Sequence, residues 1–146
     1  MNYKNTNKYR IGEIYVMYFD GIGNEQSGWR PGLVFQNNVG NDNSPNIIAL
    51  PLTSSLKKAN QPTHVIIPAD GNGLFKDSMV LCENPQRMSK DRIKGYITTL
   101  SDEYLEEVAT ASILASSAIS YIDPTKLLTI WQKAFKLNNS NMQLAS

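Results

Sequence analysis

The sequence changes its periodicity near Ser101, and this change constrains the fold more than any other feature. Before it, short runs of β-branched, aromatic and aliphatic residues are separated by turns rich in Gly, Pro and Asn, a pattern typical of short strands. The predicted strands cover residues 11–19, 31–36, 47–53, 63–67, 78–82 and 93–100. Short strands followed by helical segments predict a mainly β fold, a small barrel with C-terminal helices.

Two details refine the strand prediction. Pro51 falls within the third run, and a proline that cannot donate a backbone hydrogen bond favours an edge position or a bulge. Residues 85–90 are expected to form a short turn of helix, and residues 37–46, which are dense in Asn, Gly and Ser, are expected to form a loop.

Beyond Ser101 the apolar residues recur at alternating steps of four and three residues, from Tyr104 to Ile122. This spacing predicts one helix of about 20 residues with Ser101 as its N-cap. Asp123 and Pro124 then predict the start of a second helix, which carries an apolar stripe and a frayed tail from about residue 137. The stripe consists of Leu127, Leu128, Trp131 and Phe135. The domain prediction is therefore an N-terminal extension (1–10), a barrel with its helix (11–123), and an extra helix with its tail (124–146).

Composition excludes several classes of protein. The hydrophobic fraction of 41% fits a globular domain, and no apolar run approaches the roughly 18 residues of a membrane span. The basic first ten residues precede no apolar stretch, so a signal peptide is not expected. Cys82 is the only cysteine, so neither an internal disulfide nor a cysteine-based zinc site can form. A cytoplasmic protein without metal or cofactor is the simplest interpretation. The net charge of +1 does not mark a nucleic-acid binder, although residues 54–100 carry an excess of basic side chains.

Arg30 is a candidate catalytic residue because it follows a polar, Gly-rich loop (20–28) and immediately precedes Pro31. A residue before proline is held extended, so Arg30 should lie on a defined backbone at the entrance of a strand. A guanidinium there could bind a phosphate at two points and stabilise negative charge. The alternative is a surface ion pair with Glu25.

A second group of candidates lies at the end of the third strand and in the strand that follows. Thr53, Ser54 and Ser55 precede Lys57, and such hydroxyls and amines could hold a phosphodiester or simply cap a turn. His64 is the only histidine. Its side chain titrates near neutral pH, as acid–base cleavage of a phosphodiester requires, but a single histidine in a strand could equally be a packed structural residue.

These segments, taken in order, resemble one known family. The strand GEIY is followed by the loop GNEQSGWRP, then by VFQN and a strand ending in LT. KANQPTHV, DSMVL, KDRI and a C-terminal helix complete the series. Each piece alone is a weak signal, but their order and spacing over residues 11–122 are similar to those of the MazF/PemK toxins.

The resemblance implies an SH3-like barrel that forms a homodimer and cleaves single-stranded RNA at short sequences without a metal. The implied products carry a 5′-hydroxyl and a 2′,3′-cyclic phosphate or 3′-phosphate. A cognate antitoxin would block the RNA groove, and operator DNA would be bound only through the antitoxin complex. Arg30 and Thr53 match the family's catalytic residues, but an arginine stays protonated at neutral pH and is a better donor than base. The expected RNA-binding residues are Asn24, Glu25, Gln26, Trp29, Ser54, Ser55, Lys57, His64 and Gln86.

The chain departs from the family pattern after the fifth strand. Many relatives have E-x-x-R there, whereas this sequence has Glu83 followed by Gln86 at the arginine position and Arg87 one residue later. Two alternatives to an RNase therefore stay open: a non-enzymatic CcdB-like inhibitor, which needs no Arg–Thr pair, and a catalytically decayed toxin or regulator. The low net charge and the lack of a helix-turn-helix pattern disfavour an independent DNA reader.

Overall fold

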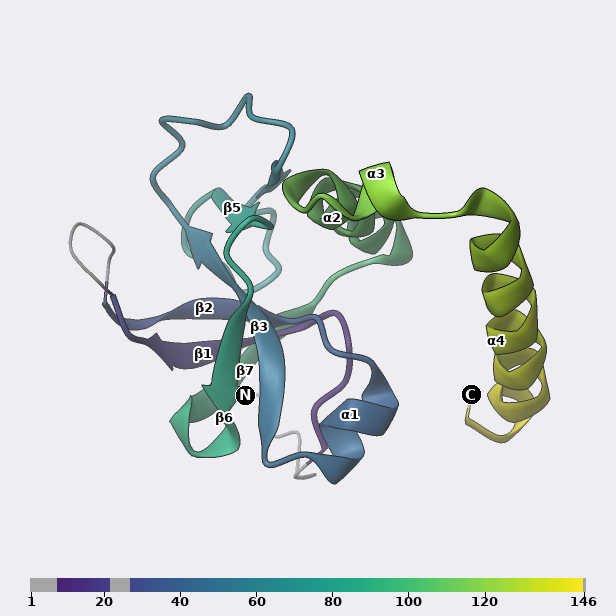
Figure 1. Ribbon diagram of the computed structural model, residues 1–146. Helices are drawn as coiled ribbons and strands as arrows, with labels where there is room; N and C mark the ends of the chain where they lie inside the picture. Colours follow the sequence, from purple (N-terminus) through teal and green to yellow (C-terminus); the bar gives the residue numbers. More distant parts are fainter. Residues whose placement is uncertain (1–7, 22–26, 146) are drawn as a thin grey trace. The chain divides into compact units, whose positions relative to one another are not determined.

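The computed structural model describes residues 8–21 and 27–145, with side chains up to residue 134. The chain divides into two compact units, residues 1–115 and 116–146. The first unit is mainly β and is shown with its labels in Figure 1. Its elements are β1 (Glu13–Phe19), β2 (Gly28–Val34), α1 (Asn38–Asn43), β3 (Asn46–Thr53), β4 (His64–Ile67), β5 (Ser78–Leu81), β6 (Gln86–Ser89), the 3₁₀ turn η1 (Lys90–Arg92), β7 (Ile93–Thr99) and α2 (Asp102–Ala115).

The strands form one antiparallel sheet in the order β4-β5-β3-β2-β1-β7, with β6 joined to β3. Among the described residues no pairing joins β4 to β7, so the hydrogen-bonded path does not close on itself. The helix α2 packs on β4 (Figure 1). The predicted fold class, mainly β with C-terminal helices, is confirmed.

β3 is the central strand of the sheet, although it contains Pro51. On one side it pairs with β2, where Pro51 lies opposite Gly32. On the other side Ala49 lies opposite Gln86, the first residue of β6, and Leu52 lies opposite Val80 of β5, so Pro51 lies in the gap between these two partners. Because antiparallel hydrogen bonds alternate and Phe35 N–H donates to Ile48 O at 2.9 Å, the nitrogen of Pro51 faces this gap. The sequence predicted an edge position or a bulge at Pro51. β3 is not an edge strand, and only the local gap between β6 and β5 resembles an edge at this residue.

The core of the first unit consists of two buried clusters on the faces of the sheet. One is built around Ile14, Leu33, Leu50 and Leu52, and also contains Val108 of α2. The other contains Tyr15, Met17, Phe19, Val34, Ile47, Ala49 and Met88. Gly32 makes the second cluster possible, because a Cβ there would lie 2.5 Å from Met17 Sδ and 2.8 Å from Phe19 Cζ. Phe19 is 2% exposed and also forms part of the pocket described below.

Three local predictions were wrong. Residues 85–90 contain the strand β6 rather than a helical turn, because this segment pairs with the first half of β3, from Asn46 to Ala49. The expected loop 37–46 contains α1, whose first turn is capped by the Asn37 side chain accepting from Gly40 N–H at 2.9 Å. The 20-residue helix ends at Ala115, and a separate turn, α3 (Ala118–Tyr121), follows Ser116 and Ser117.

The second unit is helical and contains α3 and α4 (Pro124–Ala145). The predicted N-cap is confirmed, because Asp123 Oδ1 accepts from the backbone N–H groups of Thr125 at 2.9 Å and Lys126 at 3.2 Å. The helix continues through the residues that were predicted to fray. Leu127, Leu128 and Trp131 are half-exposed, and the side chain of Phe135 lies outside the described residues. None of the helices described is both long and apolar enough to cross a membrane.

Cys82 is expected to be inert in the folded protein. Its side chain is 2% exposed, and burial raises the pKa of the thiol to about 11. We expect Ellman's reagent to modify Cys82 at pH 8 only at the rate of unfolding, because the thiolate is the reactive form. Because the folded pKa lies above the unfolded value, this group contributes stability that is present below about pH 8.5 and is lost as the pH rises toward 11. Rapid modification of native protein at pH 8 would contradict the prediction.

Candidate active site

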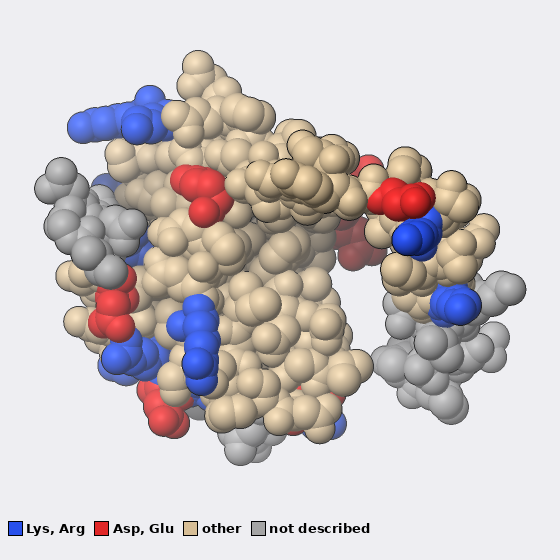
Figure 2. Space-filling model, in the orientation of Figure 1, with Lys and Arg blue, Asp and Glu red and all other residues tan. Residues whose placement is uncertain are grey.

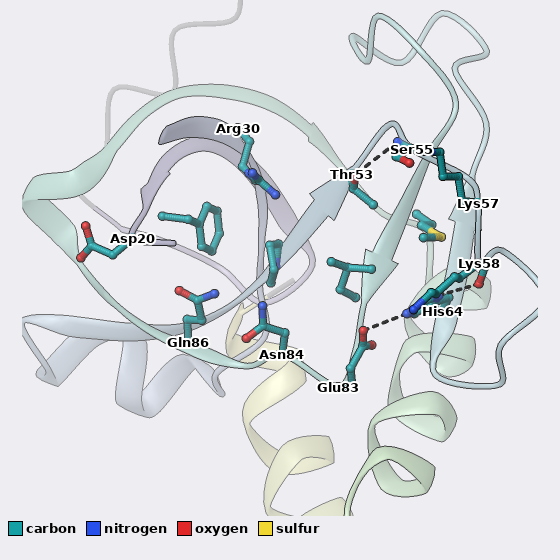
Figure 3. Close-up of a pocket in the computed structure, with 14 residues that line it drawn as sticks. Asp20, Arg30, Thr53, Ser55, Lys57, Lys58, His64, Glu83, Asn84 and Gln86 are labelled. Carbon is teal, nitrogen blue, oxygen red and sulfur yellow. Dashed lines mark hydrogen bonds and ion pairs between the residues drawn. The ribbon is translucent and has the colours of Figure 1, made fainter. Parts of the chain in front are cut away.

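The site is a pocket of about 340 Å³ at the ends of β1, β2, β3 and β5. Its apolar wall is formed by Phe19, Pro51, Met79 and Leu81. Its polar residues are Asp20, Arg30, Thr53, Ser55, Lys57, Lys58, His64, Glu83, Asn84 and Gln86 (Figure 3). Six of the predicted site residues therefore lie together: Arg30, Thr53, Ser55, Lys57, His64 and Gln86.

Arg30 lies on β2 opposite Met17 of β1, and Figure 3 shows its guanidinium pointing into the pocket on the side of Thr53. The side chain is partly buried, and desolvation lowers the pKa of Arg30 from its ordinary value. A guanidinium nevertheless remains charged at neutral pH. Partial burial strengthens its interaction with an anion, because the screening by water is reduced.

Thr53 is the last residue of β3 and lies opposite Met79 of β5. Its Oγ1 accepts from the backbone N–H of Ser55 at 3.1 Å. This bond turns the chain at the strand end and fixes the hydroxyl as an acceptor on that side. The hydroxyl proton can then be donated to an anion in the pocket, since a hydroxyl both donates and accepts.

His64 begins β4 and has both ring nitrogens occupied. Nδ1 lies 2.7 Å from the backbone oxygen of Lys58, and Nε2 lies 2.8 Å from Glu83 Oε1. The His64 side chain is 4% exposed, whereas that of Glu83 is 42% exposed. His64 thus has structural contacts as well as a place in the pocket wall, and the acid–base role left open by the sequence remains a prediction.

Amide side chains line the other side of the pocket. Figure 3 places Gln86 and Asn84 beside each other, near Asp20 and across from the lysines. Each amide can both donate and accept hydrogen bonds. This combination suits the edge of a nucleobase, whereas Arg30, Lys57 and Lys58 suit a phosphate.

Trp29 and Ser54 do not line this pocket. Trp29 packs edge-on against Tyr18, with ring centroids 5.4 Å apart, and lies under Lys94 Nζ at 4.0 Å. Ser54 lines a neighbouring pocket that also includes Arg30 and Thr53. Asn24, Glu25 and Gln26 lie outside the described residues.

Four polar residues of the pocket were not among the sequence candidates: Asp20, Lys58, Glu83 and Asn84. Glu83 and Asn84 follow β5 after Cys82, and a polar pair after a buried strand was an available signal. In the parts of the chain that the structure describes, no three His, Cys, Asp or Glu side chains gather as metal ligands. On the face seen in Figure 2, acidic and basic side chains are scattered.

Residues 10–115 match the model of the PemK-like, MazF-like toxins of type II toxin-antitoxin systems. The chain is 39% identical over 111 residues to the endoribonuclease EndoA of Bacillus subtilis, covering 75% of this chain and 96% of that protein. The chain belongs to the PemK/MazF toxin family.

Solved structures agree with the fold of this toxin-family chain. MazF of Deinococcus radiodurans superposes with a TM-score of 0.64 at 23% identity, covering 79% of this chain and 98% of that one. A mycobacterial endoribonuclease in complex with its cognate antitoxin superposes with a TM-score of 0.60 at 22% identity, covering 73% and 93%. The family match ends at the boundary of the first compact unit, so residues 116–146 lie beyond it.

A substitution that removes only the hydroxyl tests the role of Thr53 in this toxin-family site. We expect Thr53→Val to lower kcat/KM for RNA cleavage about 10- to 100-fold, because one hydrogen bond to a charged group is lost. Thr53→Ser keeps the hydroxyl and should stay within a few-fold of wild type. Single-turnover cleavage of one RNA oligonucleotide gives the comparison. Equal losses in both variants would contradict the prediction, because the hydroxyl alone would then not account for the role of Thr53.

Proposed function

We propose that this chain is the toxin of a type II toxin-antitoxin system and a sequence-specific, metal-independent endoribonuclease that cleaves single-stranded RNA. The observation that supports this most directly is the meeting of Arg30 and Thr53 in one pocket with Lys57 and Lys58. The relative from Bacillus subtilis is an endoribonuclease, and the match covers 96% of the length of that relative. The Arg–Thr pair also favours an enzyme over a non-enzymatic inhibitor on the same fold.

The reaction that this pocket suits is an internal transfer at phosphorus. The 2′-hydroxyl oxygen attacks the adjacent phosphorus, the O2′–P bond forms and the P–O5′ bond breaks. The 2′-hydroxyl loses its proton and the leaving 5′-oxygen gains one, so the products are a 2′,3′-cyclic phosphate and a 5′-hydroxyl. Addition of water to the cyclic phosphate gives a 3′-phosphate.

In this mechanism Arg30 and Thr53 act on the phosphate rather than on the nucleobase. Arg30 donates to the non-bridging oxygens, where negative charge increases in the transition state. Thr53 donates its hydroxyl proton to the same group and orients it. Lys57 and Lys58 hold the flanking backbone, while Gln86 and Asn84 contact the neighbouring base.

The proposal includes two protein partners. The mycobacterial structural neighbour is complexed with its cognate antitoxin, and we infer that an antitoxin also blocks this pocket and links the chain to operator DNA. The family resemblance implies that the toxin itself is a homodimer. Sedimentation of the purified chain tests the dimer, and loss of cleavage on adding the antitoxin tests the block.

The decisive experiment is cleavage of a long single-stranded RNA in EDTA, followed by mapping of the cut sites. We expect discrete cuts that leave a 5′-hydroxyl. A matched oligonucleotide with one 2′-deoxynucleotide on the 5′ side of the cut should resist cleavage at that position only. Absence of cleavage by folded, antitoxin-free protein would refute the nuclease, and cleavage of the deoxy-substituted bond would refute attack by the 2′-hydroxyl.

A further inference from the structure

The lysine-bearing segment of the pocket, residues 54–63, is tied to the rest of the site by a side chain from the strand that follows it. Backbone bonds form local turns within the segment, where Ala59 N–H donates to Leu56 O and Gln61 N–H donates to Lys58 O, both at 3.2 Å. They also fix its end, where Thr63 O accepts from Cys82 N–H at 3.0 Å. The His64 ring adds a bond to Lys58 O at 2.7 Å and a second one to Glu83 beyond β5, at 2.8 Å. Figure 3 shows the ring between the lysine segment and Glu83.

The two acceptors, Lys58 O and Glu83 Oε1, determine which protonation form of the His64 ring can donate a hydrogen bond to each of them. A backbone carbonyl and a carboxylate are both acceptors, so each needs an N–H from the imidazole. A neutral imidazole has only one N–H, whereas the imidazolium has two. Loss of the proton would leave a bare nitrogen against the Glu83 carboxylate, and a buried group without its partner is costly.

We propose that His64 is a positioning residue: its imidazolium ties Lys58 to Glu83 and thereby holds the lysine segment in its RNA-binding geometry. Both ring nitrogens are engaged within the protein, so neither is left for a hydrogen bond to the substrate. The substrate affinity of the site is therefore linked to the proton on this ring. This inference rests on the proposed RNA-cleaving function.

The charged groups around His64 come from two sides. The catalytic pocket contributes Glu83, Lys57, Lys58 and Asp20. On the other side of β4, a pocket of about 650 Å³ lies between His64 and α2 and is lined by Glu103, Glu106 and Glu107.

The first test separates affinity from turnover. We expect the wild-type KM for an RNA oligonucleotide to rise with increasing pH as His64 loses its proton. His64→Gln, which keeps a donor toward Glu83 but not toward Lys58, should raise KM about tenfold and leave kcat within about twofold. His64→Asn, which keeps a donor at the Nδ1 position, should retain more affinity and lose most of the pH dependence of KM.

Two further variants keep the test valid if His64 substitutions impair folding. Glu83→Gln changes a half-exposed side chain and keeps an acceptor oxygen, so it should fold and flatten the pH profile of KM. In a Lys57→Ala/Lys58→Ala background, His64→Gln should have little further effect on KM, because the lysine side chains that His64 positions are gone. Full additivity of these changes would overturn the proposal.

A readout independent of activity distinguishes failure of this inference from failure of the proposed function. Imidazole ¹H–¹⁵N NMR should show two protonated nitrogens on His64 at neutral pH. Amide exchange in residues 54–63, corrected for intrinsic rates, should accelerate when that signal is lost at higher pH. A His64 ring with only one N–H at every pH refutes the positioning role. A folded wild type that cuts no RNA refutes the nuclease, and the NMR result then still tests whether His64 bonds to both Lys58 and Glu83.

Discussion

Arg30→Ala is expected to reduce kcat/KM for RNA cleavage about 10²- to 10³-fold, the usual loss when one donor to a developing oxyanion is removed. The guanidinium is partly buried beside Thr53, where water screens its charge less than at the surface. Arg30→Lys keeps the charge but not the two-point geometry, so its activity should lie between those of alanine and wild type.

Arg87→Ala is the matched control for Arg30→Ala. Arg87 is exposed on β6, one residue after Gln86, and does not line the pocket. Its loss should change kcat/KM by no more than a few-fold. A similar loss in both alanine variants would mean that net positive charge, rather than the position of Arg30, drives cleavage.

Phe19→Ala is expected to lower the free energy of unfolding of the first unit by about 3–5 kcal/mol, because a large buried ring is replaced by a cavity. The ring is 2% exposed and packs in one cluster with Met17 and Met88. An ordinary domain has only about 5–15 kcal/mol of stability, so the variant should lose a large part of its margin. Because Phe19 also lines the pocket, RNA cleavage should fall as well.

Phe75→Ala provides the control with the same change of side chain, because Phe75 is fully exposed in this chain. Its effect on unfolding should stay within about 0.5 kcal/mol. Urea denaturation followed by near-UV circular dichroism measures both variants. Equal destabilisation would contradict the packing described for Phe19.

Strand periodicity was sufficient to predict most of the sheet, since each predicted strand overlaps an observed one. The exception, β6, has only four residues, and its conformation is determined by pairing with β3 rather than by its own propensity. The helix was predicted too long because the four–three spacing continues across Ser116 and Ser117, where the observed helix ends.

The proposed catalytic pair, Arg30 and Thr53, followed from the resemblance, and the structure places both residues in one pocket. Glu83 was missed because its importance depends on a contact with His64, 19 residues away in sequence, which no local pattern reveals. Trp29 was expected to bind RNA, but it precedes Arg30 on the same strand, and neighbouring strand residues point to opposite faces. Trp29 does not line the pocket that contains Arg30, and its expected contact with RNA remains a prediction.

The placement of β3 has a consequence for synthesis of the protein. The strand that ends in Thr53 must pair with β6, whose Gln86 lies opposite Ala49 and 37 positions further along the chain. The pocket cannot exist until both segments have left the ribosome, and at about 5–20 residues per second this takes seconds after Thr53 is made. A nascent toxin is thus harmless during most of its own translation, and a fragment truncated before residue 83 lacks one wall of the pocket.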